Sequence, residues 1–356
     1  MAQNQNLLHR WICGSGSQVS KTKNNSDSLL LNLPVDILLI INSFLPASSQ
    51  LCLLTTCHGI KRLLEHTTVP FSQLTLKQKR AYKTFVVRQF PNAWLSGRRL
   101  TFREFQAKDL CPQPKGPPYE NQPGWDRVTL RCFERGALLI RHRHIQMSLK
   151  YDRLEKKTRQ QKSFLKTLLK PYHTDFSAGL EMHPLDKFGA VGHFESHPKL
   201  VSGRYLLFNQ WTYTNPWKDG TIVLKELGRF GACKHQRMTE TGWGEFVMRQ
   251  RWRQNFRWFG IADGFSEPFF LCVDEAFNNP GCQVDGMCPY CLTEFSICAT
   301  TKMMQMRVWR DLGIEDARWT PVWRTQLGGI DLDGLPRGDD CLEIRSRYGD
   351  TGVEGH

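Results

Sequence analysis

Two prolines, Pro34 and Pro46, bracket a short apolar run near the N-terminus. A proline is tolerated where a helix begins, because the first amide hydrogens have no intrahelical partner. Asp36 would fall in the first turn, where a negative charge suits the positive end of a helix. Apolar residues at spacings of three and four predict an amphipathic helix that ends before Pro46. The residues of this stripe are Ile37, Ile41, Phe44 and Leu45.

A second apolar set follows and also falls on one helical face. It consists of Leu51, Leu54, Cys57, Ile60 and Leu64. Two or three helices within about forty residues form too small a unit to bury a core alone. Part of their apolar surface should therefore meet a partner or the rest of the chain. A buried helical hairpin is the alternative, and a membrane span is disfavoured because polar residues interrupt the run.

The run 33–46 resembles an F-box, whose pattern is Leu-Pro, an acidic residue two positions after the proline, apolar pairs and a closing Ser-Phe-Leu-Pro. The matching residues are Leu33, Pro34, Asp36, Ile37, Leu38, Ile41, Phe44, Leu45 and Pro46. The resemblance covers residues 29–66 and weakens toward its end. The family's Asp-Leu pair is replaced around Gln50, and the tryptophan expected shortly after Cys57 is missing.

The F-box resemblance implies docking to the Skp adaptor of cullin-based ubiquitin ligases. The chain would be a non-catalytic substrate receptor that links a target protein to the ligase, in the cytoplasm, the nucleus or both. Together with the amphipathic pattern, the resemblance predicts an adaptor contact made by Leu33, Pro34, Ile37, Leu38, Ile41, Leu45, Leu51 and Leu54. An F-box that acts outside a ligase, or a diverged relative with little activity, remains open.

Composition leaves one competing function. The chain has 356 residues, a net charge of +14 and a pI near 9.3, and such a basic balance suits an acidic partner or nucleic acid. Residues 249–258 mix arginines with aromatic residues, which can stack on bases and pair with phosphates. A basic, zinc-stabilised nucleic-acid-binding protein is thus the alternative. We favour a two-faced strand with its arginines in solvent, so nucleic acid is not the expected partner.

The pattern of the chain predicts an α+β protein with a small three-helix F-box, a helical connector and a β-rich C-terminal domain. The expected divisions are a tail at 1–28, the F-box at 29–68, a helical and Pro-rich connector at 69–125, the β-rich domain at 126–325 and a flexible tail at 326–356. Alternating residues predict strands over 205–213, 220–224, 295–299 and 304–308. The charged stretch 141–170 predicts an exposed helical segment.

The chain has twelve cysteines without a convincing secretion signal, which favours reduced thiols or a metal site over disulfides. Cys288 and Cys291 form a C-x-x-C turn, the arrangement in which two thiolates face one ion. A tetrahedral zinc needs two more ligands, for which Cys233 and His235 are the best candidates. Cys272, Cys282 and Cys298 are alternatives, and free buried thiols or a redox pair remain open.

The cysteine blocks also resemble a class of filamentous-fungal F-box proteins. Those proteins carry C-x-H, then C-x-Y-C-x-T-[DE]-[FY], then Trp-x-Asp-Leu-Gly. This chain has Cys233-Lys234-His235, then the octapeptide 288–295, then Trp309-Arg310-Asp311-Leu312-Gly313. Relatives often have a C-x-x-C…H stretch soon after the F-box. Here residues 94–100 hold neither cysteine nor histidine, so the resemblance implies no second metal site at that place.

Nothing in the sequence selects a catalytic group. It contains no phosphate-binding loop, nucleophile elbow, H-E-x-x-H or dinucleotide fingerprint. The histidines near 142–144 and 193–197 are typical of surface or hydrogen-bonded side chains. We therefore expect no intrinsic catalysis, with ubiquitin transfer left to the ligase partners.

Overall fold

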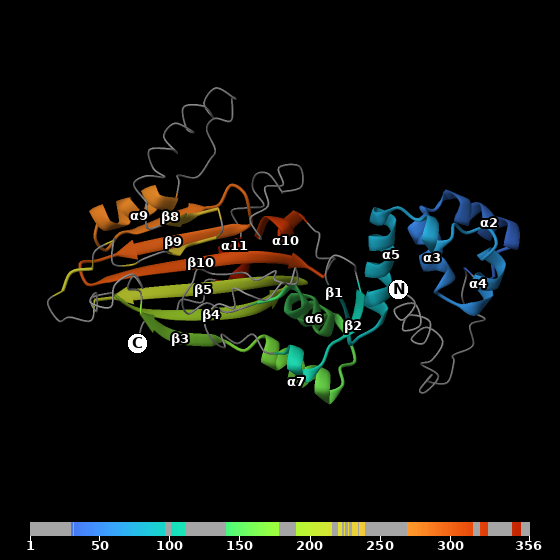
Figure 1. Cartoon of the computed structure of the whole chain (residues 1–356), viewed down its shortest axis with the longest axis horizontal. Coiled ribbons are helices and arrows are strands. Elements are labelled where there is room, and N and C mark those ends of the chain that lie inside the picture. The colour runs from blue at the N-terminus through green and yellow to red at the C-terminus, as the bar shows by residue number, and fades with distance from the viewer. Residues whose placement is uncertain are drawn as a thin grey trace, which may run out of the picture. The chain divides into compact units, whose positions relative to one another are not determined.

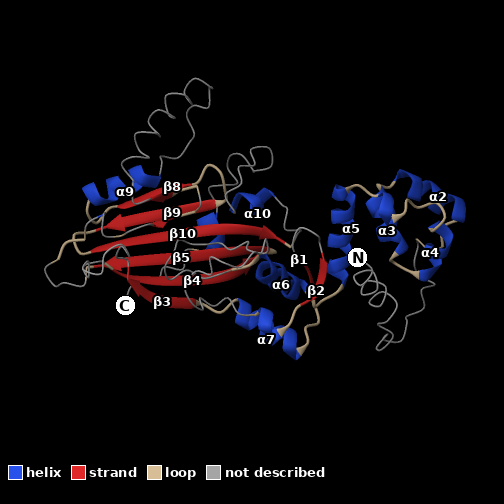
Figure 2. Ribbon diagram, viewed as in Figure 1, coloured by secondary structure: helices blue, strands red, loops and turns tan. Residues whose placement is uncertain are grey.

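The computed structural model shows a mixed α+β protein (Figures 1 and 2). It describes residues 32–96, 101–110, 140–177, 190–215, 220–222, 230–233, 235–238, 269–315, 321–326 and 344–349, with single residues 30, 224 and 227. The chain divides into two compact units, residues 1–105 and residues 106–356. The predicted tail at 1–28 and the Arg/aromatic segment 249–258 lie outside the described residues.

The first unit is helical, with one short hairpin. Its elements are α2 (Val35–Phe44), α3 (Ala47–Leu54), α4 (His58–Leu64), the 3-10 helix η2 (Phe71–Gln73), α5 (Leu76–Gln89), β1 (Ala93–Ser96) and β2 (Thr101–Glu104). Pro34 and Pro46 precede α2 and α3 as their N-caps. The apolar set from Leu51 to Leu64 does not form one helix, because the Cys57 thiol accepts the Ile60 N–H at 3.4 Å and starts α4.

Buried amides hold the first turns of this unit together. Gln50 Nε2 donates to the carbonyls of Asn42 at 2.9 Å and Leu45 at 3.1 Å, which closes the turn between α2 and α3. Asn42 Nδ2 donates to Thr67 Oγ1 at 3.3 Å, so α2 is also tied to the segment after α4. The buried apolar residues include Leu38, Ile60, Leu64, Leu74, Tyr82, Val86 and Val87. Helix α5, inside the predicted connector, belongs to this unit.

The second unit is built on a six-stranded antiparallel sheet in the order β3-β4-β5-β10-β9-β8 (Figure 2). The strands are β3 (Tyr172–Ser177), β4 (Val191–Val201), β5 (Arg204–Thr214), β8 (Gln283–Met287), β9 (Thr293–Ala299) and β10 (Met303–Ile314), with a separate pair β6 (Phe230–Gly231) and β7 (Arg237–Met238). The helices are η3 (Ala107–Asp109), α6 (His142–Arg153), α7 (Arg159–Leu168), α9 (Phe269–Asn278), α10 (Pro321–Gln326) and α11 (Ile344–Tyr348).

Three of the predicted strands are confirmed as β5, β9 and β10. The strand predicted over 220–224 is wrong for the described residues, of which 220–222 and 224 are not in a strand. Ile222 is instead buried in an irregular segment and donates its N–H to the Thr301 carbonyl at 2.8 Å. An apolar run can thus be buried without joining a ladder.

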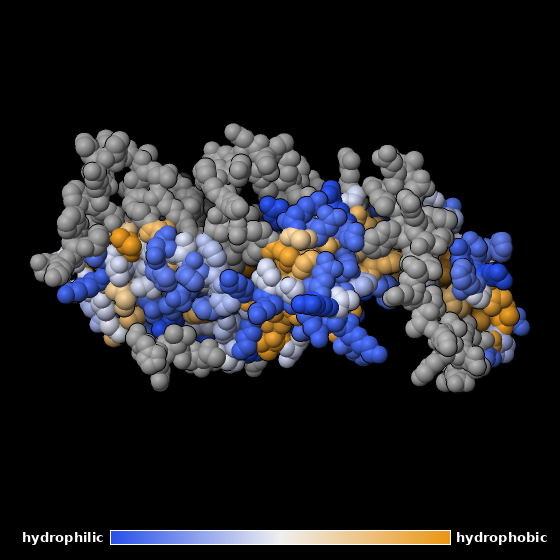
Figure 3. Space-filling view, turned by 90° about the horizontal axis from the view of Figure 1, so that it is seen from below, coloured by the Kyte–Doolittle hydropathy of each residue, from blue (hydrophilic) through white to orange (hydrophobic). Residues whose placement is uncertain are grey.

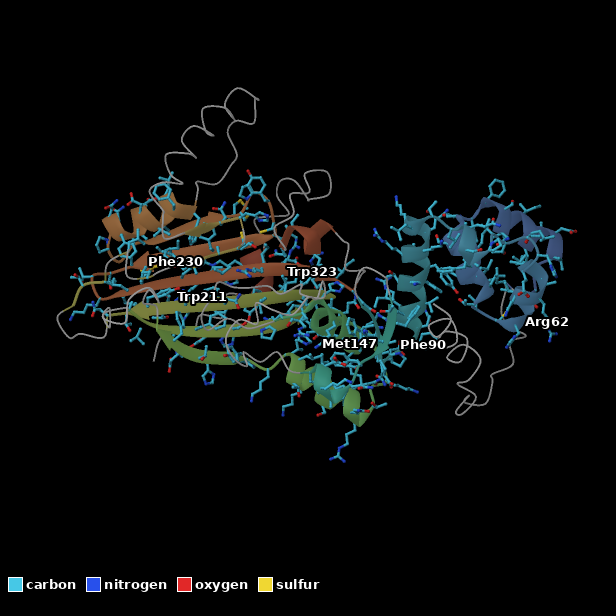
Figure 4. The ribbon with its side chains drawn as sticks, in the orientation of Figure 1. Arg62, Phe90, Met147, Trp211, Phe230 and Trp323 are labelled. Atoms are coloured by element: carbon cyan, nitrogen blue, oxygen red, sulfur yellow. The ribbon has the colours of Figure 1, made fainter. Side chains whose placement is uncertain are left out.

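The main core lies on one face of the sheet. Alternate side chains of β5, β9 and β10 pack there against α6 and α9. Trp211, Phe230 and Trp323, labelled in Figure 4, belong to this core. The prediction of an exposed helix over 141–170 is wrong for α6, in which nine residues are buried. A charge count does not say which residues a sheet will cover, and even Lys150 is only 2 % exposed.

A smaller apolar cluster occupies one end of the opposite face. It consists of Leu206, Phe208, Leu292 and Trp309 from the sheet side, with Ile344 and Tyr348 of α11. Residues 326–356 were expected to form a flexible tail, yet α11 is a helix that contacts β4, β5, β9 and β10. The tail prediction is therefore wrong for this segment, whose two apolar residues find a complementary surface on the sheet.

Glycine and phenylalanine face each other across the strand pair β8–β9. Gly286 pairs with Phe295, whose ring occupies the space that a side chain on Gly286 would need. A methyl group there would lie 2.4 Å from Phe295 Cζ.

We expect Gly286→Ala to lower the free energy of unfolding by about 1–3 kcal/mol, because the core must move to admit the methyl. Urea unfolding followed by tryptophan fluorescence measures this, with exposed Gln283→Ala as control; equal stability of both variants would contradict the packing.

His144 is buried as a neutral ring between two backbone groups. Its Nδ1 accepts the Arg141 N–H at 3.2 Å, so Nε2 is the donor to the Asp109 carbonyl at 2.8 Å. Burial, with a smaller effect of the charges of Arg143 and Arg141, lowers the pKa of His144 to about 3, although the hydrogen bond to the Asp109 carbonyl raises it. The His144 imidazole therefore binds a proton near pH 6.5 in the unfolded chain, whereas in the folded chain it stays neutral at that pH.

From this we expect stability to fall as the pH drops below about 6.5, by up to ~1.4 kcal/mol per pH unit from this residue. His144→Gln keeps a donor and an acceptor but does not titrate, so its free energy of unfolding should depend less on pH between 7 and 5. Chemical unfolding at each pH measures the two slopes. Equal slopes in wild type and variant would show that His144 does not stay neutral.

Candidate metal centre

Two tight turns position the four predicted ligands. Between β6 and β7, the Cys233 and Gln236 backbone groups exchange N–H···O bonds at 3.3 Å, which folds Cys233 and His235 to the same side. Gln236 Oε1 also accepts the Phe269 N–H at 2.9 Å, anchoring this turn to the start of α9. The turn thus presents its two ligands from a fixed backbone.

The second turn joins β8 to β9 and carries the C-x-x-C pair. The Tyr290 N–H donates to Cys288 Sγ at 3.4 Å, and the Cys288 N–H donates to the Thr293 carbonyl at 2.9 Å. These bonds curl the backbone around the sulfur of Cys288 and bring Cys291 back toward it. The strand that follows Cys291 excludes the helix that a thioredoxin-like redox site would need.

The four side chains converge on one point. Cys288 Sγ lies 3.6 Å and Cys233 Sγ 3.9 Å from His235 Nδ1, and the four possible ligand atoms, including Cys291 Sγ, are all within 4.8 Å of one another. In a tetrahedron with Zn–S near 2.3 Å and Zn–N near 2.0 Å, sulfur and nitrogen lie about 3.5 Å apart. The spacing therefore fits a four-coordinate metal, and the cluster can hold such an ion.

The sequence offers three other cysteines as alternative ligands. Among the described residues, the convergent group contains neither Cys272 of α9, nor exposed Cys282, nor Cys298 of β9. The C-x-H pair and the C-x-x-C pair therefore come together although they are distant in the sequence.

Burial makes three adjacent thiolates costly without a cation. Cys233, Cys288 and Cys291 are 3–5 % exposed. Burial opposes ionisation of Cys233, but hydrogen bonds from Cys288, Cys291 and His235 and the charge of Arg310 bring its pKa well below the ordinary value. Burial and the neighbouring Cys233 raise the pKa of Cys288, and they do the same to Cys291. A bound metal would supply the positive charge that lets all three ionise.

The surroundings hold the ligands in place. Arg310 of β10 is 2 % exposed and its Nη2 donates to the Ala232 carbonyl, next to Cys233. Thr293 Oγ1 lies 3.2 Å from Cys291 Sγ. The His235 ring packs at 5.5 Å from that of Tyr290, and its Nε2 has no hydrogen-bond partner within the described part of the chain. Nδ1 faces the sulfurs, so it is the nitrogen available to a metal.

Four protein ligands would complete a tetrahedron in a buried place. A catalytic zinc site keeps one position open for water or substrate, whereas a structural site is closed. The donor set Cys₃His thus has the character of a structural centre that joins the β6–β7 turn to the β8–β9 turn.

The residues predicted to contact an adaptor lie in the first unit at different depths. Pro34 and Ile37 are exposed, while Leu38 is only 2 % exposed and fills the core of the unit. The other five are half-buried: Leu33, Ile41, Leu45, Leu51 and Leu54. In this conformation Leu38 cannot offer its side chain to a partner, because α2 turns it inward.

The predicted adaptor contact omits the two most exposed apolar residues of α2, Ile40 and Phe44. Ile40 is 52 % and Phe44 83 % exposed, and with Ile37 at 42 % they form what we call the α2 stripe. Their spacing of three and four residues was the available signal. Figure 3 shows hydrophobic residues at the surface of this unit.

Comparison of the chain with protein-family models, with curated proteins and with solved structures gave no match. None of the helices in the described residues is long and apolar enough to span a membrane.

We expect the purified protein to carry about one metal ion per chain, and Cys291→Ser to lose most of it, because three ligands hold a structural ion poorly. Elemental analysis by mass spectrometry after dialysis measures the content. Exposed Cys282→Ser is the matched control and should keep the ion. Metal loss in both variants, or in neither, would contradict the assignment.

Proposed function

We propose that the chain is an F-box substrate receptor, which docks onto a Skp adaptor through its first unit and presents a target through its second. The observation that carries the proposal is the α2 stripe of Ile37, Ile40 and Phe44. Exposed side chains of this size on one helix of a small unit are typical of a protein-binding surface. The Leu-Pro start and the Ser-Phe-Leu-Pro end of the same helix support an F-box as the source of that surface.

The geometry of α2 supports a partner on its outer face. Leu38 and Asn42, one turn apart, are buried on the inner face and hold the helix to its unit. Ile37, Ile40 and Phe44 point away from that face and keep 42 %, 52 % and 83 % of their surface exposed, which a partner could cover. Fully burying an exposed side chain of this size is worth about 1.5–3 kcal/mol, and the surface that these three still expose can supply a share of that each to an adaptor contact.

We infer that the metal of the Cys₃His centre is zinc in a structural role. Three thiolates and one imidazole nitrogen form a set that zinc prefers, and the closed coordination leaves no place for a substrate. Its contribution to the receptor would be to fix the β6–β7 turn against the sheet. No group in this proposal is catalytic, and ubiquitin transfer would belong to the other ligase subunits.

The direct test is co-expression with a Skp adaptor followed by affinity capture. We expect wild type to retain the adaptor and Ile40→Asp/Phe44→Asp to lose it, because two carboxylates would replace the apolar anchors at a cost above about 2 kcal/mol. Leu76→Asp is the matched control. Leu76 is 60 % exposed in the same unit but lies at the start of α5, so its variant should still bind.

Leu33→Ala/Pro34→Ala extends the test to the start of the motif and should weaken binding by about 1 kcal/mol or more per residue. Failure of folded wild-type protein to bind the adaptor would overturn the F-box proposal. Equal binding by wild type and by the α2 variant would overturn the assignment of the stripe. Circular dichroism of each variant establishes that it is folded.

A further inference from the structure

A shallow apolar floor lies at one end of the sheet face that is turned away from α6 and α9. It is formed by Leu206 and Phe208 of β5, Trp309 of β10 and Leu292, which precedes β9. Phe208 and Trp309 lie 5.4 Å apart at its centre. The five-residue helix α11, labelled in Figure 1, packs on this floor through Ile344 and Tyr348. We call the floor and its polar rim the α11 groove.

Side chains on the rim of the groove form hydrogen bonds with the backbone at both ends of α11. The Glu294 carboxylate of β9 accepts the N–H groups of Ile344 at 2.9 Å and Arg345 at 3.1 Å, at the N-terminal end of α11. At the other end, Lys199 Nζ of β4 donates to the Tyr348 carbonyl at 2.6 Å. A carboxylate at the amino end and an ammonium at the carboxyl end also complement the helix dipole. Both charged groups bind backbone atoms, so they can bind any short helix of this length whatever its side chains are.

Side-chain contacts add selectivity. Ile344 and Tyr348, four positions apart, both point to the floor and are buried. The Tyr348 ring lies 5.7 Å from that of Phe208, and its hydroxyl donates to the His197 carbonyl at 2.9 Å. Arg345 stacks 4.9 Å over Trp309 and reaches Asp285 at 3.4 Å. The groove therefore selects an aliphatic residue, a basic residue next to it, and an aromatic residue four positions after the first.

The covering helix is too short to persist on its own. Isolated helices of five residues do not form in water, because nucleation costs more than so few hydrogen bonds return. Gly349, at a φ of 77°, ends it directly after Tyr348. The helical form of α11 therefore depends on its contacts with Glu294, Lys199 and the apolar floor. Release of α11 would also expose the rings of Phe208 and Trp309.

We propose that the α11 groove is a docking site for a short amphipathic helix of a target protein, and that α11 is a built-in competitor that occupies it. The inference rests on the proposed receptor function, which requires a target surface on the second unit. The target helix would carry the pattern that α11 displays, with an aliphatic anchor, an adjacent basic residue and an aromatic anchor one turn later. Such a target must outcompete a tethered helix, whose effective concentration is on the order of millimolar.

The test uses the full chain and a labelled synthetic peptide with the sequence of residues 342–350. Ile344→Ala/Tyr348→Ala weakens the chain's own helix and leaves the sheet side of the groove intact. Fluorescence anisotropy should show peptide binding to this variant at least about tenfold tighter than to wild type, because the competitor has been removed. A peptide with the same two alanines is the control and should not bind.

Adding Glu294→Ala to the variant should reduce peptide affinity by about tenfold or more, since the amino end of the helix loses its acceptor.

Absence of peptide binding to the folded Ile344→Ala/Tyr348→Ala variant would overturn the proposal and make α11 a structural cover. Equal binding to variant and wild type would place the peptide elsewhere and overturn it as well. The adaptor capture described above uses the first unit and no peptide. A protein that binds the peptide but no adaptor has the groove without the F-box function, whereas one that binds the adaptor but no peptide has the reverse.

Discussion

The pairing of β5 with β10 at the centre of the sheet is the contact on which the second unit depends. It joins two strands far apart in the chain, with Trp309 opposite Phe208 and Met306 opposite Trp211. Side chains alternate across a strand, so β10 serves both faces. Arg310 donates a hydrogen bond to the Ala232 carbonyl, next to the candidate ligand Cys233. Its neighbour Trp309 forms part of the floor of the α11 groove. A one-residue slip of this ladder would exchange the two and abolish both sites.

A cation in the Cys₃His cluster would offset the cost of ionising its buried thiols. The core encloses three thiols within a few ångströms, where burial raises the pKa of Cys288 and Cys291. A cation bound there would displace the thiol protons, and its binding free energy would stabilise the folded state. The same ion would hold the short β6–β7 pair, which has only two ladder residues in each strand, against the larger sheet. The proposed structural role follows from this dependence.

The two proposed protein contacts use surfaces of opposite kinds. The α2 stripe is open and apolar, and its partner would be another folded protein. The α11 groove is already covered, and its charged rim recognises backbone groups of a helix. A receptor with these properties would hold its adaptor through constant apolar anchors and exchange its own α11 for a target. Affinity for the target would then depend on how firmly Ile344 and Tyr348 hold the floor.

The sequence by itself determined the local patterns. Prolines bounded α2, alternation placed β5, β9 and β10, and spacing indicated the Cys288/Cys291 pair, with Cys233 and His235 as the best of several candidates for the other two ligands. Those features act within a few residues, through backbone sterics and side-chain period. Only the tertiary structure decided that α6 is buried, that 220–222 is no strand and that α11 docks on the sheet. Each of these depends on which distant surface covers a segment, and neither charge content nor local propensity carries that information.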